Sequence, residues 1–320
     1  MMRKFSSAAV CAAVALAIAA AGCGKIGDLQ GKMAFRDANG LYQAQDYRKA
    51  AAKYEAVIAA APDTTDPDLT TAYFFLGNSY DNLYRASRAG EAENDAMLTK
   101  AITNYKKAAE VVVNPQIKSL ALQYLVAAYG PDKLNDPSQA ETILKQMIEM
   151  DPKDTSNYFV LSKIYQDAGD YEQAEAQLLK AKEAAPSDVA VLMQLAGFYN
   201  TQGEFPKTIE ALEQRVALEP NNPEAHHTVA TYYWDEVYRD FRLPEAEKRK
   251  YIQAGLDAVD KALALNADYF EAITYKNLLL RLQANLEKDA GKQQALLKEA
   301  DRLRDRALEL RKTKTAGAGD

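Results

Sequence analysis

The sequence contains little of the chemistry on which most enzymes and metal sites depend. Its 320 residues include 2 cysteines, 2 histidines and 1 tryptophan. The histidines, His226 and His227, are adjacent, and neighbouring residues of a helix point about 100° apart, so the two imidazoles cannot share one metal in the usual way. No nucleotide-binding loop of the Walker type occurs. We therefore expect no catalytic residues, no cofactor and no metal.

Stretches of basic residues are also missing. Lysine and arginine number 39 against 45 aspartates and glutamates, which gives a formal net charge of −6. An acidic chain without a basic stripe is a poor binder of nucleic acid, so no nucleic-acid partner is expected. Glycine is scarce as well, with 15 residues. Together with abundant alanine, the best helix former, this composition favours an all-helical protein.

Residues 1–22 have the pattern of a secretory signal. Arg3 and Lys4 precede an apolar run over residues 8–21, and Gly22 and Cys23 follow at once. The run is too short for a comfortable transmembrane helix and has the proportions of a signal peptide.

The stretch from Ala20 to Cys23 resembles a bacterial lipobox, with Ala20 where a leucine-like residue is usual. The resemblance implies that residues 1–22 are removed, that Cys23 is acylated and that residues 23–33 form a lipidated tether. Gly24, in place of an aspartate, implies the periplasmic face of the outer membrane. Because Cys11 would leave with the leader, the mature chain would have no free thiol and no disulfide. An ordinary cleaved signal and an uncleaved anchor remain alternatives.

An internal repeat occupies residues 152–220. Pro152, Pro186 and Pro220 are equally spaced along the chain, and a common pattern fills both intervals. The first copy reads Tyr158-x2-Leu161-Ser162-x2-Tyr165, Gly169-Asp170-Tyr171 and Ala174-x3-Leu178, and the second reads Leu192-x2-Leu195-Ala196-x2-Tyr199, Gly203 and Thr208-x3-Leu212. Spacings of three, four and seven mark one face of a helix, glycine marks the turn, and proline ends the second helix. A fixed period of this kind indicates a repeat array.

The pattern resembles the tetratricopeptide repeat (TPR) family. That resemblance implies an all-α, right-handed solenoid of about six to seven helix-turn-helix repeats over residues 34–311, followed by a disordered tail at 312–320. Two repeats contain about a dozen extra residues, one between Tyr80 and Ala101 and the other between Tyr233 and Gly255. In the first of these places we expect extended helices joined by a polar loop, and at both places we expect the extra residues to project at the helix pair.

Proteins of this family line a concave groove with side chains of the first helix of each repeat. Stepping along these helices from the leading signature positions selects the candidate partner-binding residues Phe35, Asn39, Tyr42, Phe74, Asn78, Phe159, Lys163, His227 and Trp234. The phenylalanines are expected to be exposed anchors, and the asparagines to bond the backbone of a bound peptide. Lys163 is the one basic residue among them, so a clamp for a terminal carboxylate is not supported.

These observations predict a non-catalytic scaffold, lipid-anchored in the bacterial envelope, that binds peptide or protein segments. Assembly of an envelope or pilus complex is one pathway that such proteins serve. Three alternatives stay open: a non-catalytic subunit of an envelope enzyme complex, a small-ligand-binding protein, and a structural spacer without a specific ligand.

Overall fold

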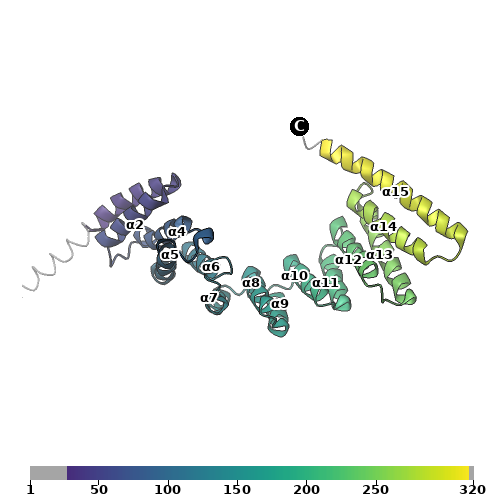
Figure 1. Ribbon diagram of the computed structural model, residues 1–320, viewed down its shortest axis with the longest axis horizontal. Coiled ribbons are helices and arrows are strands. Elements are labelled where there is room, and N and C mark those ends of the chain that lie inside the picture. The colour runs from purple at the N-terminus through teal and green to yellow at the C-terminus, as the bar shows by residue number, and fades with distance from the viewer. Residues whose placement is uncertain (1–26, 317–320) are drawn as a thin grey trace, which may run out of the picture. The chain divides into compact units, whose positions relative to one another are not determined.

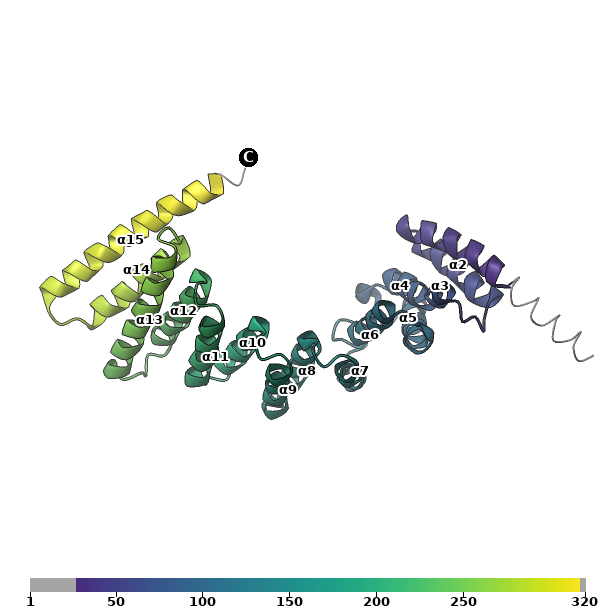
Figure 2. The same cartoon turned by 180° about the vertical axis from the view of Figure 1, so that it is seen from behind.

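The computed structural model describes residues 27–316, and these residues form helices joined by turns, with no strand among them (Figures 1 and 2). The all-α prediction is confirmed. The first helix covers residues 27–43. The others are α2 (Tyr47–Ala60), α3 (Pro67–Thr70), α4 (Ala72–Leu83), α5 (Ala92–Val111), α6 (Pro115–Ala128), α7 (Pro137–Met150), α8 (Thr155–Asp167), α9 (Tyr171–Ala184), α10 (Val189–Thr201), α11 (Phe205–Leu218), α12 (Pro223–Arg239), α13 (Glu245–Leu265), α14 (Phe270–Leu286) and α15 (Ala290–Ala316).

The chain divides into two compact units between residues 157 and 158. The described part of unit 1 holds the helix pairs formed by residues 27–43 with α2, by α4 with α5, and by α6 with α7. Unit 2 begins within the first turn of α8 and holds the pairs α8–α9, α10–α11, α12–α13 and α14–α15. Within each unit, every helix pair packs against the next pair along the chain, as expected of a repeat array.

One backbone position recurs in the turns between paired helices. Five described residues have positive φ, and four of them precede a closing proline by the same interval: Gln45, Asn135, Gly169 and Gly203. An aspartate follows three of them, and its carboxylate accepts a backbone N–H of the next helix: Asp46, Asp136 and Asp170. The repeat therefore specifies a left-handed residue and then a helix cap, which together reverse the chain.

Small residues allow the paired helices to approach closely. A Cβ on Gly77 of α4 would lie 2.8 Å from Cδ1 of Tyr105 and 3.1 Å from the carbonyl oxygen of Ala101, both on α5. Tyr105 is fully buried, so its ring has little room to move aside. The signature glycine is thus a packing requirement. Tyr158, another signature residue, is buried as predicted.

The extra residues of the second repeat lengthen α5 to 20 residues, whereas α4 keeps 12. The connection contains a short 3-10 helix, Ala86–Arg88. Asn94 organises it, because its Oδ1 accepts the N–H of Arg85 at 2.8 Å and its Nδ2 donates to the carbonyls of Arg85 and Arg88, each at 3.1 Å. The prediction of extended helices is confirmed for α5 and wrong for α4.

In the sixth repeat both helices are extended, and α12 has 17 residues while α13 has 21. Only residues 240–244 connect them. Phe241 in this connection is 83% exposed. The extra residues of this repeat therefore lie mainly in the two helices.

Two predicted boundaries are wrong. Residues 27–33, expected as tether, are helical. A Cβ on Gly27 would lie 2.5 Å from the carbonyl oxygen of Ala60, and one on Gly31 would lie 3.2 Å from Cδ1 of Leu69, so this segment packs closely on the array. At the other end α15 continues to Ala316, so residues 312–316 are helical where a disordered tail was expected.

The leader, Cys23 and residues 317–320 lie outside the described residues. Among the helices of the described part, none is both long and apolar enough to cross a membrane.

Candidate functional site

Aromatic side chains gather in unit 1, on the first helix and on α2, α4, α5 and α6. We define the unit 1 cluster as Phe35, Tyr42, Tyr54, Phe74, Phe75, Tyr105 and Tyr124. Phe75 is its centre, with ring centroids of four other members 5.3 to 6.3 Å away. Edge-to-face and stacked contacts of this kind fix the rings against one another.

The cluster has a buried layer and a half-buried layer. Tyr54 and Tyr105 are fully buried, and Phe74 is 5% exposed, against the expectation of an exposed anchor. Phe74 fails that expectation because it points at Tyr105 and Tyr124 of the following helices. Its neighbour Phe75 is half-buried and had not been selected from the sequence. Phe35, Tyr42 and Tyr124 are also half-buried.

The asparagines of this region bond to tyrosine hydroxyls within the protein. The hydroxyl of Tyr54 donates to Oδ1 of Asn39 at 2.6 Å, and that of Tyr42 donates to Oδ1 of Asn78 at 2.6 Å. Nδ2 of Asn78 donates to the hydroxyl of Tyr105 at 3.4 Å. The prediction that Asn78 is exposed to a bound peptide is wrong, because it is buried and its amide is used inside the fold. Asn39 is half-buried, with its oxygen already bonded.

An ion pair lies next to Tyr105 of the unit 1 cluster. Nζ of Lys133, in the turn between α6 and α7, lies 2.5 Å from Oδ1 of Asp81 on α4. Oδ2 of Asp81 accepts the hydroxyl of Tyr105 at 3.3 Å. Burial is the main cause that raises the pKa of Tyr105, as it is for the pKa of Tyr54. Both phenols therefore stay neutral donors at ordinary pH.

Two candidate residues lie on α8 in unit 2. Phe159 is half-buried, and Lys163 is exposed. Nζ of Lys163 is 2.5 Å from Oδ1 of Asp167, one turn further along the same helix. A pair of this kind on a helix surface is typical of a solvated face and is worth a few tenths of a kcal/mol, roughly 0.3 to 0.5.

The remaining two candidates lie on α12. The ring centroid of His227 is 5.2 Å from that of Tyr269 and 5.1 Å from that of Tyr275. Trp234 meets Tyr275 edge-on at 5.6 Å and stacks on Tyr238 at 4.9 Å. The structure thus joins His227 and Trp234 through Tyr275 of α14, which the sequence alone did not indicate. Burial lowers the pKa of His227.

A cavity of about 300 Å³ opens beside His227. Side chains of α12, α14 and α15 line it, among them His227, Phe270, Thr274, Tyr275, Arg304 and Leu308. The lining is mostly apolar, with charged groups from Glu271, Arg304 and Arg311. We call it the unit 2 cavity. No pattern in the sequence indicates it, because the helix α15 that completes it has a weak repeat signature.

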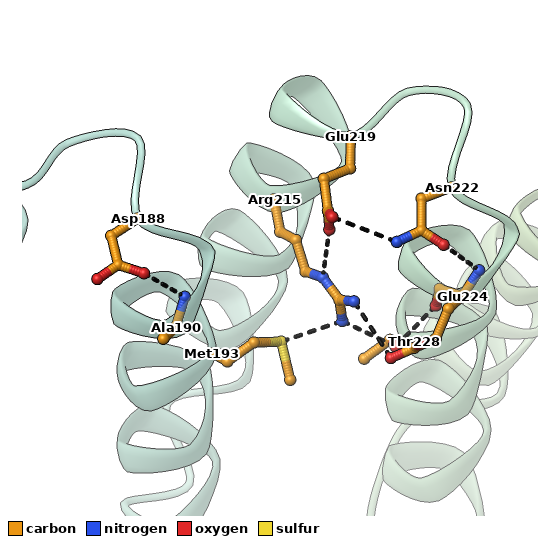
Figure 3. Close-up of polar contacts among 8 residues, drawn as sticks. All are labelled: Asp188, Ala190, Met193, Arg215, Glu219, Asn222, Glu224 and Thr228. Atoms are coloured by element: carbon orange, nitrogen blue, oxygen red, sulfur yellow. Dashed lines mark hydrogen bonds and ion pairs between the residues drawn. The ribbon is translucent and has the colours of Figure 1, made fainter.

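A buried arginine cross-links three helices elsewhere in unit 2 (Figure 3). Arg215 of α11 is 6% exposed. Its guanidinium donates to Glu219 at 3.0 Å, to Glu224 at 3.2 Å, to Thr228 at 3.3 Å and to Sδ of Met193 at 3.3 Å. It occupies the position that Ala181, a small packing residue, has in the preceding repeat. Because the described contacts occupy all three guanidinium nitrogens, we assign it a structural role.

Comparison with known proteins agrees with this architecture. Residues 133–196 match the sequence model of the tetratricopeptide repeat. This segment of the chain therefore carries tetratricopeptide repeats. The C-terminal part of a TPR repeat-containing protein from Cytophaga hutchinsonii superimposes with a TM-score of 0.54 at 16% identity, over 86% of this chain and 98% of that one. A tetratricopeptide repeat protein from Parabacteroides merdae gives 0.44 at 12% identity, over 85% and 99%.

Anaphase-promoting complex subunit 3 of Dictyostelium discoideum is 30% identical over 94 residues. This segment is 29% of the present chain and only 9% of that protein. Tetratricopeptide repeat proteins are scaffolds for interactions between proteins. In this chain, Phe35, Tyr42, Phe75, His227 and Trp234 all lie on the first helices of their repeats.

Proposed function

We propose that this chain is a non-catalytic adaptor that binds a segment of another protein on the half-buried aromatic side chains of its repeats, and that a lipid on Cys23 holds it at a bacterial envelope membrane. The tetratricopeptide repeats in residues 133–196 support the scaffold role. The unit 1 cluster is the observation that carries the binding role.

The cluster suits binding because its accessible rings are held rigidly. Phe35, Tyr42 and Phe75 are half-buried, and each contacts two or more other rings. A rotamer that is already fixed loses little entropy when a partner covers it. Large aromatic side chains at such positions are the usual energetic centres of interfaces. Since Asn39 and Asn78 are bonded inside the fold, we expect apolar contact rather than their amides to dominate recognition.

Recovery of crosslinked partners from envelope membranes tests this role. Phe75→Ala and Phe35→Ala should each lower recovery at least about thirtyfold, which corresponds to the roughly 2 kcal/mol or more of a binding anchor. The matched control is Phe241→Ala, an exposed aromatic of unit 2, which should leave recovery unchanged. Full recovery with both cluster variants, in protein that is still folded, would remove the basis of the proposal. The identity of the captured protein would decide between an envelope, pilus or other pathway.

The anchor is supported by the basic start, the short apolar run and Gly22-Cys23. Mass spectrometry should find an acylated Cys23 as the mature N-terminus, and the protein should enter the detergent phase on partitioning. Cys23→Ser should release it into the aqueous phase. If the Cys23→Ser protein stays with the membrane as before, the lipid-anchor proposal is wrong while the binding proposal stands.

A further inference from the structure

We propose that the unit 2 cavity receives one large apolar side chain, aromatic or leucine-like, of a partner protein, and that the arginines of α15 hold a carboxylate next to that side chain. The proposal rests on the proposed function in one respect, namely that the occupant is a protein segment. It adds that this segment must carry a large apolar side chain next to a carboxylate.

The size and walls of the cavity fit an apolar side chain. An apolar protein cavity of about 150 Å³ can hold benzene. The unit 2 cavity, at about 300 Å³, has room for a benzyl group and part of the adjoining backbone. Phe270, Tyr275, Ala307 and Leu308 form much of its wall. Leu308 is 48% exposed, so a side chain that enters would remove apolar surface from water.

Two arginines of α15 stand at the rim of the cavity. Arg304 and Arg311 stand two helical turns apart on α15, with Leu308 between them on the same face. Glu271 is the acidic residue among the described lining residues, and Asp301 and Asp305 pair with Arg304 beside the cavity. A segment with a carboxylate beside its apolar residue complements this rim.

Arg304 is able to take part although it already has acidic neighbours. Its Nη1 is 3.0 Å from Oδ1 of Asp301, and its Nη2 is 2.8 Å from Oδ1 of Asp305. These pairs are exposed, and exposed pairs contribute little. A guanidinium has five N–H donors, more than these two carboxylates need.

The two histidines supply an internal control. His227 lines the unit 2 cavity. His226 is 8% exposed, and its Nε2 lies 2.9 Å from the carbonyl oxygen of Pro220. It lines a different hollow, with residues of α11 and α13. Because the chain has no other histidine, NMR of ¹³C-labelled imidazoles reports on the cavity and on a neighbouring site at the same time.

The test is a titration of the full chain with the capped peptide acetyl-Asp-Phe-Asp-amide. We expect a saturable shift of the His227 signals and no shift at His226. The matched peptide acetyl-Asn-Phe-Asn-amide should bind about fivefold more weakly, as expected of two solvent-exposed charge contacts. The peptide acetyl-Asp-Ala-Asp-amide should produce no shift. Fluorescence of Trp234, the sole tryptophan, gives a second readout through its contact with Tyr275.

Variants locate the binding. Leu308→Asp should abolish the shift, whereas Leu265→Asp, at a leucine that is 43% exposed at the end of α13, should preserve it. Arg304→Gln should remove most of the preference for the aspartate peptide over the asparagine peptide.

Three results would overturn the proposal. Unmoved His227 signals in folded protein exclude the side-chain site, and equal binding of the aspartate and asparagine peptides excludes the carboxylate. Tighter binding of 3-phenylpropionate than of the peptide would assign the cavity to a small aromatic acid. None of these results affects partner recovery by the unit 1 cluster, so failure of this inference is distinguishable from failure of the proposed function.

Discussion

The two units place aromatic residues at similar positions of the repeat and use them differently. In unit 1, Phe74 meets Tyr105 and Tyr124, so the rings fill the space between helices. In unit 2, Tyr275 meets His227 and Trp234 and, together with His227, lines a cavity. The position in the repeat sets the direction of a side chain, whereas the side chains opposite decide whether it becomes core or part of a site.

The largest expected effect concerns the closely packed rings of the unit 1 cluster. Phe74→Ala should lower the free energy of unfolding by about 3 to 4 kcal/mol, because it removes a buried ring and leaves a cavity among other rings. Denaturant unfolding followed by circular dichroism measures the change. The control Phe241→Ala should stay within about 0.5 kcal/mol of the parent. Similar values for the two variants would show that the unit 1 cluster is not closely packed.

Arg215 tests what holds unit 2 together. Arg215→Ala should cost about 2 kcal/mol, since it removes buried contacts from three helices. We place it below the range for a fully buried pair because Glu219 and Glu224 keep contact with water. Arg215→Met, which retains the apolar stem, should cost less than about 1 kcal/mol. If the methionine variant loses as much as the alanine variant, the charge rather than the packing is the main contribution.

His227 should make the stability of unit 2 depend on pH. Burial lowers its pKa in the fold, so as pH falls through the ordinary value of about 6.5 the unfolded chain takes up a proton that the folded chain resists. Stability should therefore fall with pH until the folded imidazole also protonates. Nearby Glu224 and Glu271 oppose the shift, and Arg304 and Arg311 of α15 also line the cavity.

The midpoint of denaturant unfolding at pH 7.5, 6.5 and 5.5 measures this dependence, and His227→Gln should flatten it relative to the parent. If the unfolding midpoints of the parent and of His227→Gln change equally with pH, His227 is not the cause of the pH dependence.

The smallest expected effect concerns the turns and is stabilising. Gln45→Gly should raise the free energy of unfolding by about 0.5 to 1 kcal/mol, because Gln45 has a φ of 60° and glycine adopts that conformation without strain. Ala44→Gly, one position earlier, should gain nothing. Asn135→Gly should gain less than Gln45→Gly, since asparagine tolerates the left-handed region. A loss of stability in Gln45→Gly would show that its side chain contributes more than its backbone strain costs.

Much of the fold could be predicted from the sequence because the residues that form and end the helices recur at a fixed spacing. The equally spaced prolines, with Gly169 and Gly203 before two of them, located the helix pairs and turns. The start of the array was missed because Gly27 and Gly31 are not signature residues, and their role becomes visible only where Ala60 and Leu69 meet them.

Less of the candidate site could be predicted, for a geometric reason. One residue of error on a helix turns a side chain by about 100°. That is the difference between Phe74, which is buried, and Phe75, which is half-buried. The hydroxyl partners of Asn39 and Asn78 lie on other helices, and the unit 2 cavity needs side chains of α15. Contacts between helices of this kind leave no periodic pattern in the chain.

The contacts of α15 tie the unit 2 cavity to local unfolding. Its main contact in the described chain is with α14, so local unfolding can detach it while the other helix pairs stay packed. Detachment would carry Arg304 and Leu308 away and dismantle the cavity. A ligand in the cavity should therefore slow amide hydrogen exchange along α15. A partner segment bound there should also protect α15 from proteases.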